Sequence, residues 1–418
     1  MFWIVSGEGI IHGFANGVKQ THGLQQDAVS WQIQVTDELG FFENLSVHAS
    51  NQLHHTVWNG FTFYDLIFPL FIFIAGVSMP FSYSKQLSAG VDAKKKIYRS
   101  LIKRTILLLL LGMIVNGLLQ WKGYEETRFA SVLGRIALSC FFAALIYLNS
   151  SFRWRIAWFL FLLLGYWLLM MAVPVPGFGA GVLTPEGNFA AYIDQLLLPG
   201  KMHRSTYDPE GILPTIPAIG TALLGIFTGE FLRLQQHSQQ KKALYMLLAG
   251  ILFVVIGWSW SFLFPINKDM WTSSFVLLTG GLSLLLLAIF YFIIDVRGFK
   301  TWSMPFVWLG CNSILIYMAA HGVVNFMSTS EFLFGGTLQL VDAKWQEAFL
   351  WIGVAIIQFA GLYLLYKQKW FYDEGSYGYE IRNFKNEQKK SGIFAGSLFK
   401  GSARTIRNLR RSSHPLTH

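Results

Sequence analysis

Cysteine is almost absent from this chain, which has only Cys140 and Cys311 among its 418 residues. Both lie in long apolar segments, so the sequence excludes a disulfide framework and argues against metal binding by thiolates. Charged residues are also scarce, at 13% of the chain, whereas hydrophobic residues make up 53%. Because a soluble domain has about 25% charged residues, this composition excludes that class and indicates a membrane protein.

Several functional motifs are missing as well. The sequence has no ligand spacing typical of zinc sites, no glycine-rich phosphate loop and no serine in a nucleophile elbow. It shows no internal repeat, which argues against a transporter built from inverted halves. We therefore expect no metal, and any chemistry must come from polar residues scattered along an apolar chain.

Ten apolar segments are present instead, and most reach the length of about 20 residues that crosses a hydrocarbon core of about 30 Å. With no water in the bilayer, the backbone must satisfy its own hydrogen bonds, so these segments should be helices. The sequence thus predicts an all-α, polytopic transmembrane helical bundle. The predicted spans are residues 1–15 (short for a crossing), 62–84, 97–119, 128–149, 154–173, 212–233, 243–264, 272–294, 303–325 and 346–367.

Lys and Arg residues lie almost entirely in alternate gaps between these segments, most densely at residues 85–104. The positive-inside rule then places both termini in the cytoplasm and two long segments, 16–61 and 174–211, on the exoplasmic side. The net charge of +10 lies in cytoplasmic loops and the tail. We attribute it to anionic lipid headgroups rather than to nucleic acid.

The chain divides into two regions of different composition. Residues 1–367 form the predicted transmembrane domain. Residues 368–418 are rich in Lys, Arg, Ser and Gly and have little hydrophobic periodicity. This composition predicts a basic, disordered cytoplasmic tail.

A few ionisable residues lie inside predicted spans, where they are costly and mark function by default. Counting inward from the outer surface places Asp65 about 5 Å deep and Arg135 about 10 Å deep. His321 reaches the same outer half on a helix rising outward, and His54 and His55 lie just outside the span that carries Asp65. The sequence therefore predicts a polar site in the outer leaflet, under the two long exoplasmic segments.

These intramembrane residues also have structural interpretations. Asp65 and Arg135 could pair to hold two helices together. His321 could be a hydrogen-bonded histidine between helices, and Glu230, at the cytoplasmic end of its span, fits an interfacial residue.

The loop residues have structural interpretations as well. Asp208, Pro209 and Glu210 have the pattern of a helix start, with Asp as N-cap, Pro at the first position and Glu in the first turn. His54 and His55 could be ordinary loop residues.

Residues 55–60, His-Thr-Val-Trp-Asn-Gly, followed by Asp-Leu-Ile-Phe-Pro at 65–69, resemble the signature of heparan-α-glucosaminide N-acetyltransferase and its bacterial relatives. The resemblance covers roughly residues 50–370. Family members begin with a longer first helix bearing a Leu-Asp-x-x-Arg-Gly motif and usually end near the position of Trp370, so both ends of this chain depart from the pattern. Further matching motifs follow in order at 133–136, 174–177, 192–198, 207–213, 267–273, 295–298 and 312–317.

The resemblance implies a transmembrane acetyltransferase in the plasma (inner) membrane of a bacterium. The family takes acetyl-CoA from the cytoplasmic side and acetylates the amino group of a terminal glucosamine on the far side. Its active histidine corresponds to His55 in the His-x-x-Trp-Asn-Gly motif. The partners implied are an amino-sugar or glycan acceptor and membrane lipids, with a homodimer left open.

Elementary chemistry is consistent with this. An amine must lose a proton to attack a thioester, and histidine is suited to accept it. The developing oxyanion needs donors, for which Asn59, Asn312 and Arg135 are candidates. The basic residues Lys103 and Arg104 could attract the coenzyme A phosphates or serve topology alone. The assignments are His55, Asn59 and Asp65 for catalysis; Lys103, Arg104, Arg135, Asn312 and His321 for acetyl-CoA; and Trp58, Asp208 and Glu210 for the acceptor.

Two rival functions remain open. A transporter or lipid-linked glycan carrier could use Asp65, Arg135 and His321 to line a translocation path. An O-acyltransferase of an envelope glycan would differ only in its acceptor. His55 beside an outer-leaflet polar cluster, rather than charges at the midplane, favours acetyl transfer.

Overall fold

The described part of the chain is built from helices. The computed structural model describes residues 1–87, 93–120 and 123–368. The predicted tail, from residue 369 onward, lies outside them. The α-helices are α1 Glu8–His22, α2 Phe41–Gln52, α3 Phe63–Leu87, α4 Ala93–Val115, α5 Val132–Asn149, α6 Phe152–Ala172, α7 Phe189–Leu197, α8 Thr215–Arg233, α9 Gln239–Trp260, α10 Ser273–Tyr291, α11 Met304–Cys311, α12 Ser313–Met318, α13 Phe326–Leu338 and α14 Gln346–Gln368.

Among the described residues, seven helices are long and apolar enough to cross a membrane: α3, α5, α6, α8, α9, α10 and α14. An eighth span results if the pair Thr301–Cys311 and Ser313–His321, bent by 68° at its break, is counted as one. The predicted all-α polytopic bundle is therefore confirmed. The count of ten spans and the cytoplasmic position of both termini stay predictions.

Two predicted spans match neither these seven helices nor the bent pair. The predicted span 97–119 corresponds to α4, whose first half carries Arg99, Lys103 and Arg104. The predicted span 1–15 belongs to a π-helix, Trp3–Gly7, that continues into α1 and ends at His22. The charged residues of α4 and the polar side chains of α1 lower the hydropathy of these two helices.

The two long exoplasmic segments contain helices that the hydrophobic pattern did not show. Residues 16–61 hold the end of α1 and all of α2, and residues 174–211 hold α7. The side chain of Asn188 caps α7 by accepting a hydrogen bond from the amide of Ala191 at 2.8 Å. Such a cap satisfies one of the free amides at a helix start, so the sequence did carry a local signal for this helix.

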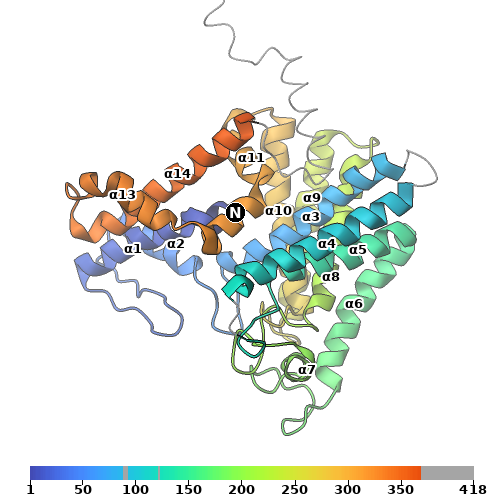
Figure 1. The fold of residues 1–418 in the computed structure, drawn as a ribbon. Coiled ribbons are helices and arrows are strands. Elements are labelled where there is room, and N and C mark those ends of the chain that lie inside the picture. The colour runs from blue at the N-terminus through green and yellow to red at the C-terminus, as the bar shows by residue number, and fades with distance from the viewer. Residues whose placement is uncertain (88–92, 121–122, 369–418) are drawn as a thin grey trace, which may run out of the picture. The chain divides into compact units, whose positions relative to one another are not determined.

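Two groups of helices can be followed in Figure 1. α1, α2, α13 and α14 lie together, and α3 to α6 lie beside α8, α9 and α10. The largest apolar core belongs to the second group, where α3 packs on α8 and α9 packs on α10. α8 is the most buried of the spanning helices, and it lies at the centre of this core.

Glycines allow α3 and α8 to approach closely. A Cβ placed on Gly225 of α8 would lie 2.1 Å from the carbonyl oxygen of Phe73 and 3.0 Å from the Cα of Gly76 in α3. Gly229, one turn further along α8, meets the backbone of Val77 in the same way. Small residues four apart are a common means of bringing membrane helices into contact.

We expect Gly225→Ala to destabilise the protein by about 1–3 kcal/mol, because the added methyl group overlaps backbone that cannot move aside. Thermal unfolding of the purified protein in detergent measures this loss. Gly361→Ala in α14 is the matched control, since nothing lies within 4 Å of its added Cβ. Equal melting temperatures for the two variants would contradict the proposed close packing.

Candidate active site

His55 and Asp65 form a hydrogen-bonded pair at the start of α3. Asp65 lies in the first turn of that helix, and His55 lies in the loop that precedes it. The Nδ1 of His55 is 2.7 Å from Oδ1 of Asp65. The carboxylate side chain is 1% exposed, whereas the imidazole is 49% exposed. A buried acid thus orients an accessible base.

The second carboxylate oxygen of Asp65 accepts hydrogen bonds from the same loop. The Thr62 amide and hydroxyl donate to Oδ2 at 3.2 Å and 3.1 Å, and the Thr56 hydroxyl donates to it at 3.2 Å. These donors, together with the N-terminal end of the helix, stabilise an ionised carboxylate. An ionised Asp65 accepts from Nδ1–H of His55, which leaves Nε2 unprotonated.

Lys268, between α9 and α10, completes this cluster. Its Nζ lies 2.9 Å from Nδ1 and 3.0 Å from Nε2 of His55, and 3.5 Å from Oδ1 of Asp65. The neighbouring Asn267 is fully buried, and its amide nitrogen donates to the Trp58 carbonyl at 3.0 Å and to the Asn59 side-chain oxygen at 3.1 Å. The loop that carries Lys268 is therefore attached to the His-x-x-Trp-Asn-Gly segment.

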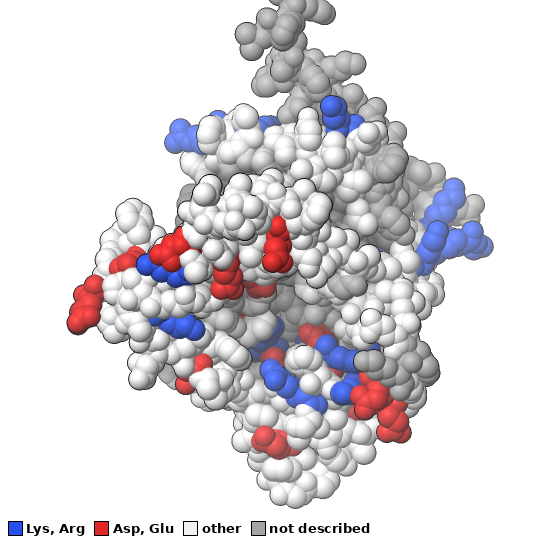
Figure 2. Space-filling model, turned by 60° about the vertical axis from the view of Figure 1, so that its left-hand side comes forward, with Lys and Arg blue, Asp and Glu red and all other residues white. Residues whose placement is uncertain are grey.

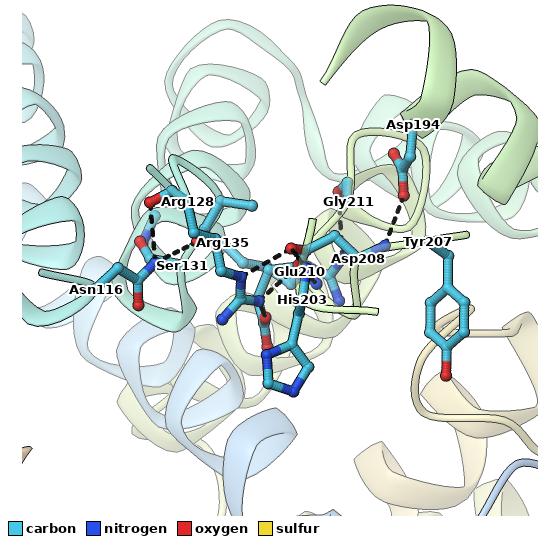
Figure 3. A network of polar contacts seen from close by, with 12 residues as sticks. Asn116, Arg128, Ser131, Arg135, Asp194, His203, Tyr207, Asp208, Glu210 and Gly211 are labelled. Carbon is cyan, nitrogen blue, oxygen red and sulfur yellow. Dashed lines mark hydrogen bonds and ion pairs between the residues drawn. The ribbon is translucent and has the colours of Figure 1, made fainter. Parts of the chain in front are cut away.

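A second polar cluster lies around Arg128 (Figure 3). The Arg128 guanidinium donates to both carboxylate oxygens of Asp208, at 2.8 Å and 2.6 Å, and also to Glu210. The backbone amide of His203 donates to Asp208 at 2.8 Å. Although burial alone would raise it, the hydrogen bond and charge of Arg128 hold the pKa of Asp208 below its ordinary value.

The helix-start interpretation of Asp208 and Glu210 is wrong. α8 begins at Thr215, and Asp208 instead accepts from the Glu210 amide at 2.9 Å within a turn. The carboxylates are held by Arg128 from another segment of the chain. A local cap pattern was thus overridden by a long-range ion pair.

Arg135 and Asp194 lie behind this cluster. Arg135 does not pair with Asp65: its guanidinium donates to the Gly211 carbonyl at 3.2 Å and lies over the Trp271 ring, 5.1 Å from the centroid. Asp194, in α7, accepts from the Ile212 amide at 2.9 Å. Burial raises the pKa of Asp194 to about 6 despite these amide donors.

Aromatic rings connect the two clusters. The Trp58 ring contacts the Tyr207 ring edge-on with centroids 5.1 Å apart, and the Trp58 indole donates to the Leu183 carbonyl at 2.9 Å. The Tyr207 hydroxyl donates to Asp269 at 2.8 Å, next to Lys268. Figure 2 shows acidic and basic side chains gathered around a hollow on one face of the molecule.

A pocket of about 520 Å³ lies between α1, α14 and the segment after α12. Its polar lining comes from Glu8, His321, Asn325 and Gln358, and the rest is apolar. Glu8 shares a hydrogen bond with Tyr64, whose ring centroid is 4.6 Å from that of His55. Glu8 in the pocket wall is thus connected to the imidazole of His55 through the Tyr64 side chain.

The residues predicted to bind acetyl-CoA are dispersed. His321 lines the pocket, with Nδ1 3.0 Å from the Tyr317 carbonyl of its own helix, so this bond does not join two helices. Asn312 is buried at the bend between α11 and α12. Lys103 and Arg104 lie in the middle of α4, outside both polar clusters.

Sequence reasoning missed three residues that the structure places in these clusters. The predicted span 128–149 begins with Arg128, whereas α5 begins at Val132. Asp194 and Lys268 were read only as parts of matching motifs. Lys268 follows Asn267 in a short segment between two spans, a signal that marks a loop but not its partners.

Comparison with known proteins agrees with this arrangement. A sequence model described as "Heparan-alpha-glucosaminide N-acetyltransferase, catalytic" matches residues 34–264. The mouse heparan-alpha-glucosaminide N-acetyltransferase is 29% identical over 384 residues, covering 76% of this chain and 56% of its own length. The human enzyme of that name is 31% identical over 329 residues, covering 65% of this chain and 49% of its own length. The chain spans about half the length of these curated relatives, and it belongs to the heparan-alpha-glucosaminide N-acetyltransferase family.

Proposed function

We propose that this protein is a membrane-embedded acetyltransferase that moves an acetyl group from acetyl-CoA to the amino group of a glucosamine-type sugar. The observation that carries the proposal is the His55–Asp65 pair, in which a buried carboxylate fixes an accessible imidazole. The family relationship supports both the acetyl donor and the amino-sugar acceptor. We further propose cytoplasmic entry of the donor, exoplasmic binding of the acceptor, and residence in a bacterial inner membrane.

His55 acts as the general base in this proposal. Nε2 takes a proton from the acceptor amine while the nitrogen attacks the thioester carbonyl carbon. A carbon–nitrogen bond forms, the carbon–sulfur bond breaks, and the proton on Nε2 passes to the departing thiolate. The products are the acetylated amine, free coenzyme A and the neutral imidazole, so the enzyme returns to its starting state.

The tetrahedral oxyanion requires a nearby donor. Asn59 is exposed, four residues after His55 in the same loop, and its side-chain oxygen already accepts from Asn267 at 3.1 Å, which leaves its amide nitrogen to donate. Arg135 is buried behind Trp271, and Asn312 is buried at a helix bend. Of the three predicted candidates, Asn59 therefore has the best position.

The pocket beside α14 suits the donor's pantetheine arm. That arm is mostly apolar and contains two amide N–H groups. Gln358 lines the pocket, is 3% exposed, and has a side-chain oxygen without a partner among the described residues. A buried acceptor without a partner is costly, and an amide N–H of the donor would satisfy it. The acceptor sugar would lie on the side of Trp58 and Tyr207.

We expect Ala320→Trp, which adds bulk to the pocket lining, to raise the KM for acetyl-CoA by roughly tenfold, because it removes about 1.4 kcal/mol of binding. The KM for the acceptor should change little. Ala343→Trp, at an exposed position before α14, is the matched control. A rise in the acceptor KM instead would assign the pocket to the sugar.

The activity itself is tested by incubating purified protein in liposomes with radiolabelled acetyl-CoA and glucosamine. N-acetylglucosamine should form, and a glycan whose amine is blocked should remain unlabelled. Labelling of the blocked glycan would instead support an O-acyltransferase. Uptake of sugar without acetylation would support a transporter.

A further inference from the structure

We infer that Lys268 sets the protonation state of His55: its ammonium group keeps the imidazole neutral, so that Nε2 is free to accept the proton of the attacking amine. The inference rests on the proposed function, because it concerns the same site. It assigns Lys268 a positioning and electrostatic role that acts through His55.

The position of the Lys268 ammonium group differs from that of a hydrogen-bond donor. Its Nζ is 2.9 Å from Nδ1 and 3.0 Å from Nε2 of His55. An atom that is equally far from both ring nitrogens does not lie along the lone pair of either. Asp65 accepts the hydrogen bond of Nδ1–H. The Nε2 lone pair is therefore free to take the proton of the acceptor amine. Lys268 acts on the imidazole through its charge.

The negative charge of Asp65 beside the imidazole is balanced by the positive charge of Lys268. Asp65 alone would stabilise the imidazolium form and remove the base, because an opposite charge favours the charged form. The ammonium group, 3.5 Å from Asp65, opposes this effect. The other titratable groups that face His55 are His54 beside it, Tyr64 against its ring, Glu8 bonded to Tyr64, and His12 stacked on His54.

None of these other groups can replace Lys268. Burial lowers the pKa of His54, which keeps that side chain neutral. Glu8 is hydrogen-bonded to Tyr64 rather than to His55 and carries a negative charge, not a positive one. Lys268 is therefore the cation closest to the imidazole among the described residues.

The chain holds Lys268 at this place at a structural cost. Trp271, three residues further, has a positive φ of 50°, which a residue with a side chain rarely adopts. Its ring is fully buried between Phe68, at 4.9 Å, and the Arg135 guanidinium, at 5.1 Å. The Lys268 side chain is itself only 16% exposed. The rare backbone conformation at Trp271 and the burial of its ring fix the loop that carries Lys268.

The inference is tested with Lys268→Met, which removes the charge, and Lys268→Arg, which keeps it. The quantity measured is the pH dependence of kcat/KM for acetylation of glucosamine. In Lys268→Met the imidazole protonates more readily, so the acid limb should move to higher pH by about one unit. Activity at pH 6 should then fall about tenfold further than activity at pH 9. Lys268→Arg should keep the acid limb in place.

Lys201→Met is the matched control, because Lys201 pairs with Glu126 in an exposed loop and its side chain is 57% exposed. A uniform loss of activity in Lys268→Met at every pH, with an unmoved acid limb, would overturn the inference and leave Lys268 a purely structural residue. The same limb shift in both Lys268 variants would also overturn it. Wild-type protein that forms no acetylated sugar would reject the proposed function itself, a distinct outcome.

Discussion

His55→Ala is expected to lower the turnover of acetyl transfer by on the order of 10²-fold or more, because it removes the base that accepts the amine proton. The protein should stay folded. The imidazole is 49% exposed and lies in a loop, so it contributes little to helix packing. Turnover is measured with labelled acetyl-CoA and glucosamine, and folding is checked by thermal unfolding in the same detergent.

His54→Ala is the matched control for this variant. His54 points away from Asp65 and stacks on His12, with ring centroids 4.3 Å apart. Its carbonyl accepts from the Thr62 hydroxyl, a contact that alanine retains. The loss of turnover should therefore be far smaller. Near-normal activity of a folded His55→Ala protein would show that the site has been assigned wrongly.

His55 could also carry the acetyl group covalently for a moment. In that route the enzyme would keep label after incubation with labelled acetyl-CoA alone and removal of the coenzyme. We favour direct transfer in a ternary complex, because an acetylated imidazole hydrolyses readily unless water is excluded, and this ring is accessible. Retained label that is lost in His55→Ala would reverse this preference.

The apolar pattern was sufficient to predict the long spanning helices, but neither their ends nor the short helices α2 and α7. Most spans coincide with predicted segments because hydrophobic length is read directly from the sequence. The start of α5 was placed four residues early, at residue 128 instead of Val132. That error hid Arg128, whose partners Asp208 and Glu210 lie 80 and 82 residues away. Pairing across such distances in the sequence depends on the fold, and no local pattern encodes it.

The site itself was predictable in part. Asp65 lies near the start of a predicted span, and His55 lies ten residues earlier, just outside that span. The sequence alone therefore placed the two residues close together. The alternative in which Asp65 pairs with Arg135 is not found, because Asp65 bonds to His55 and Arg135 donates to the Gly211 carbonyl. Lys268 comes from a loop 213 residues away from His55. Its position next to His55 depends on how α10 packs against α3.

Asp65→Asn is expected to reduce turnover by roughly 10²-fold while the fold is kept. An asparagine of the same size still meets the Thr56 and Thr62 donors, but its amide no longer specifies which nitrogen of His55 carries the proton. An imidazole in the wrong tautomer cannot present a free Nε2 lone pair. Turnover, melting temperature and elution volume of the variant should be measured on one preparation. Glu230→Gln is the matched control, since Glu230 pairs with Arg155 outside both polar clusters.

The pH profile of this variant should also shift, in the direction opposite to that of Lys268→Met. Asp65 stabilises the protonated imidazole, so its neutralisation should move the acid limb of kcat/KM to lower pH. The Lys268 ammonium, now without its carboxylate partner, strengthens this effect. Opposite shifts in the two variants would identify His55 as the titrating group between a fixed anion and a fixed cation. Shifts of the same sign, or an Asp65→Asn protein that turns over normally, would mean that a group other than His55 accepts the proton.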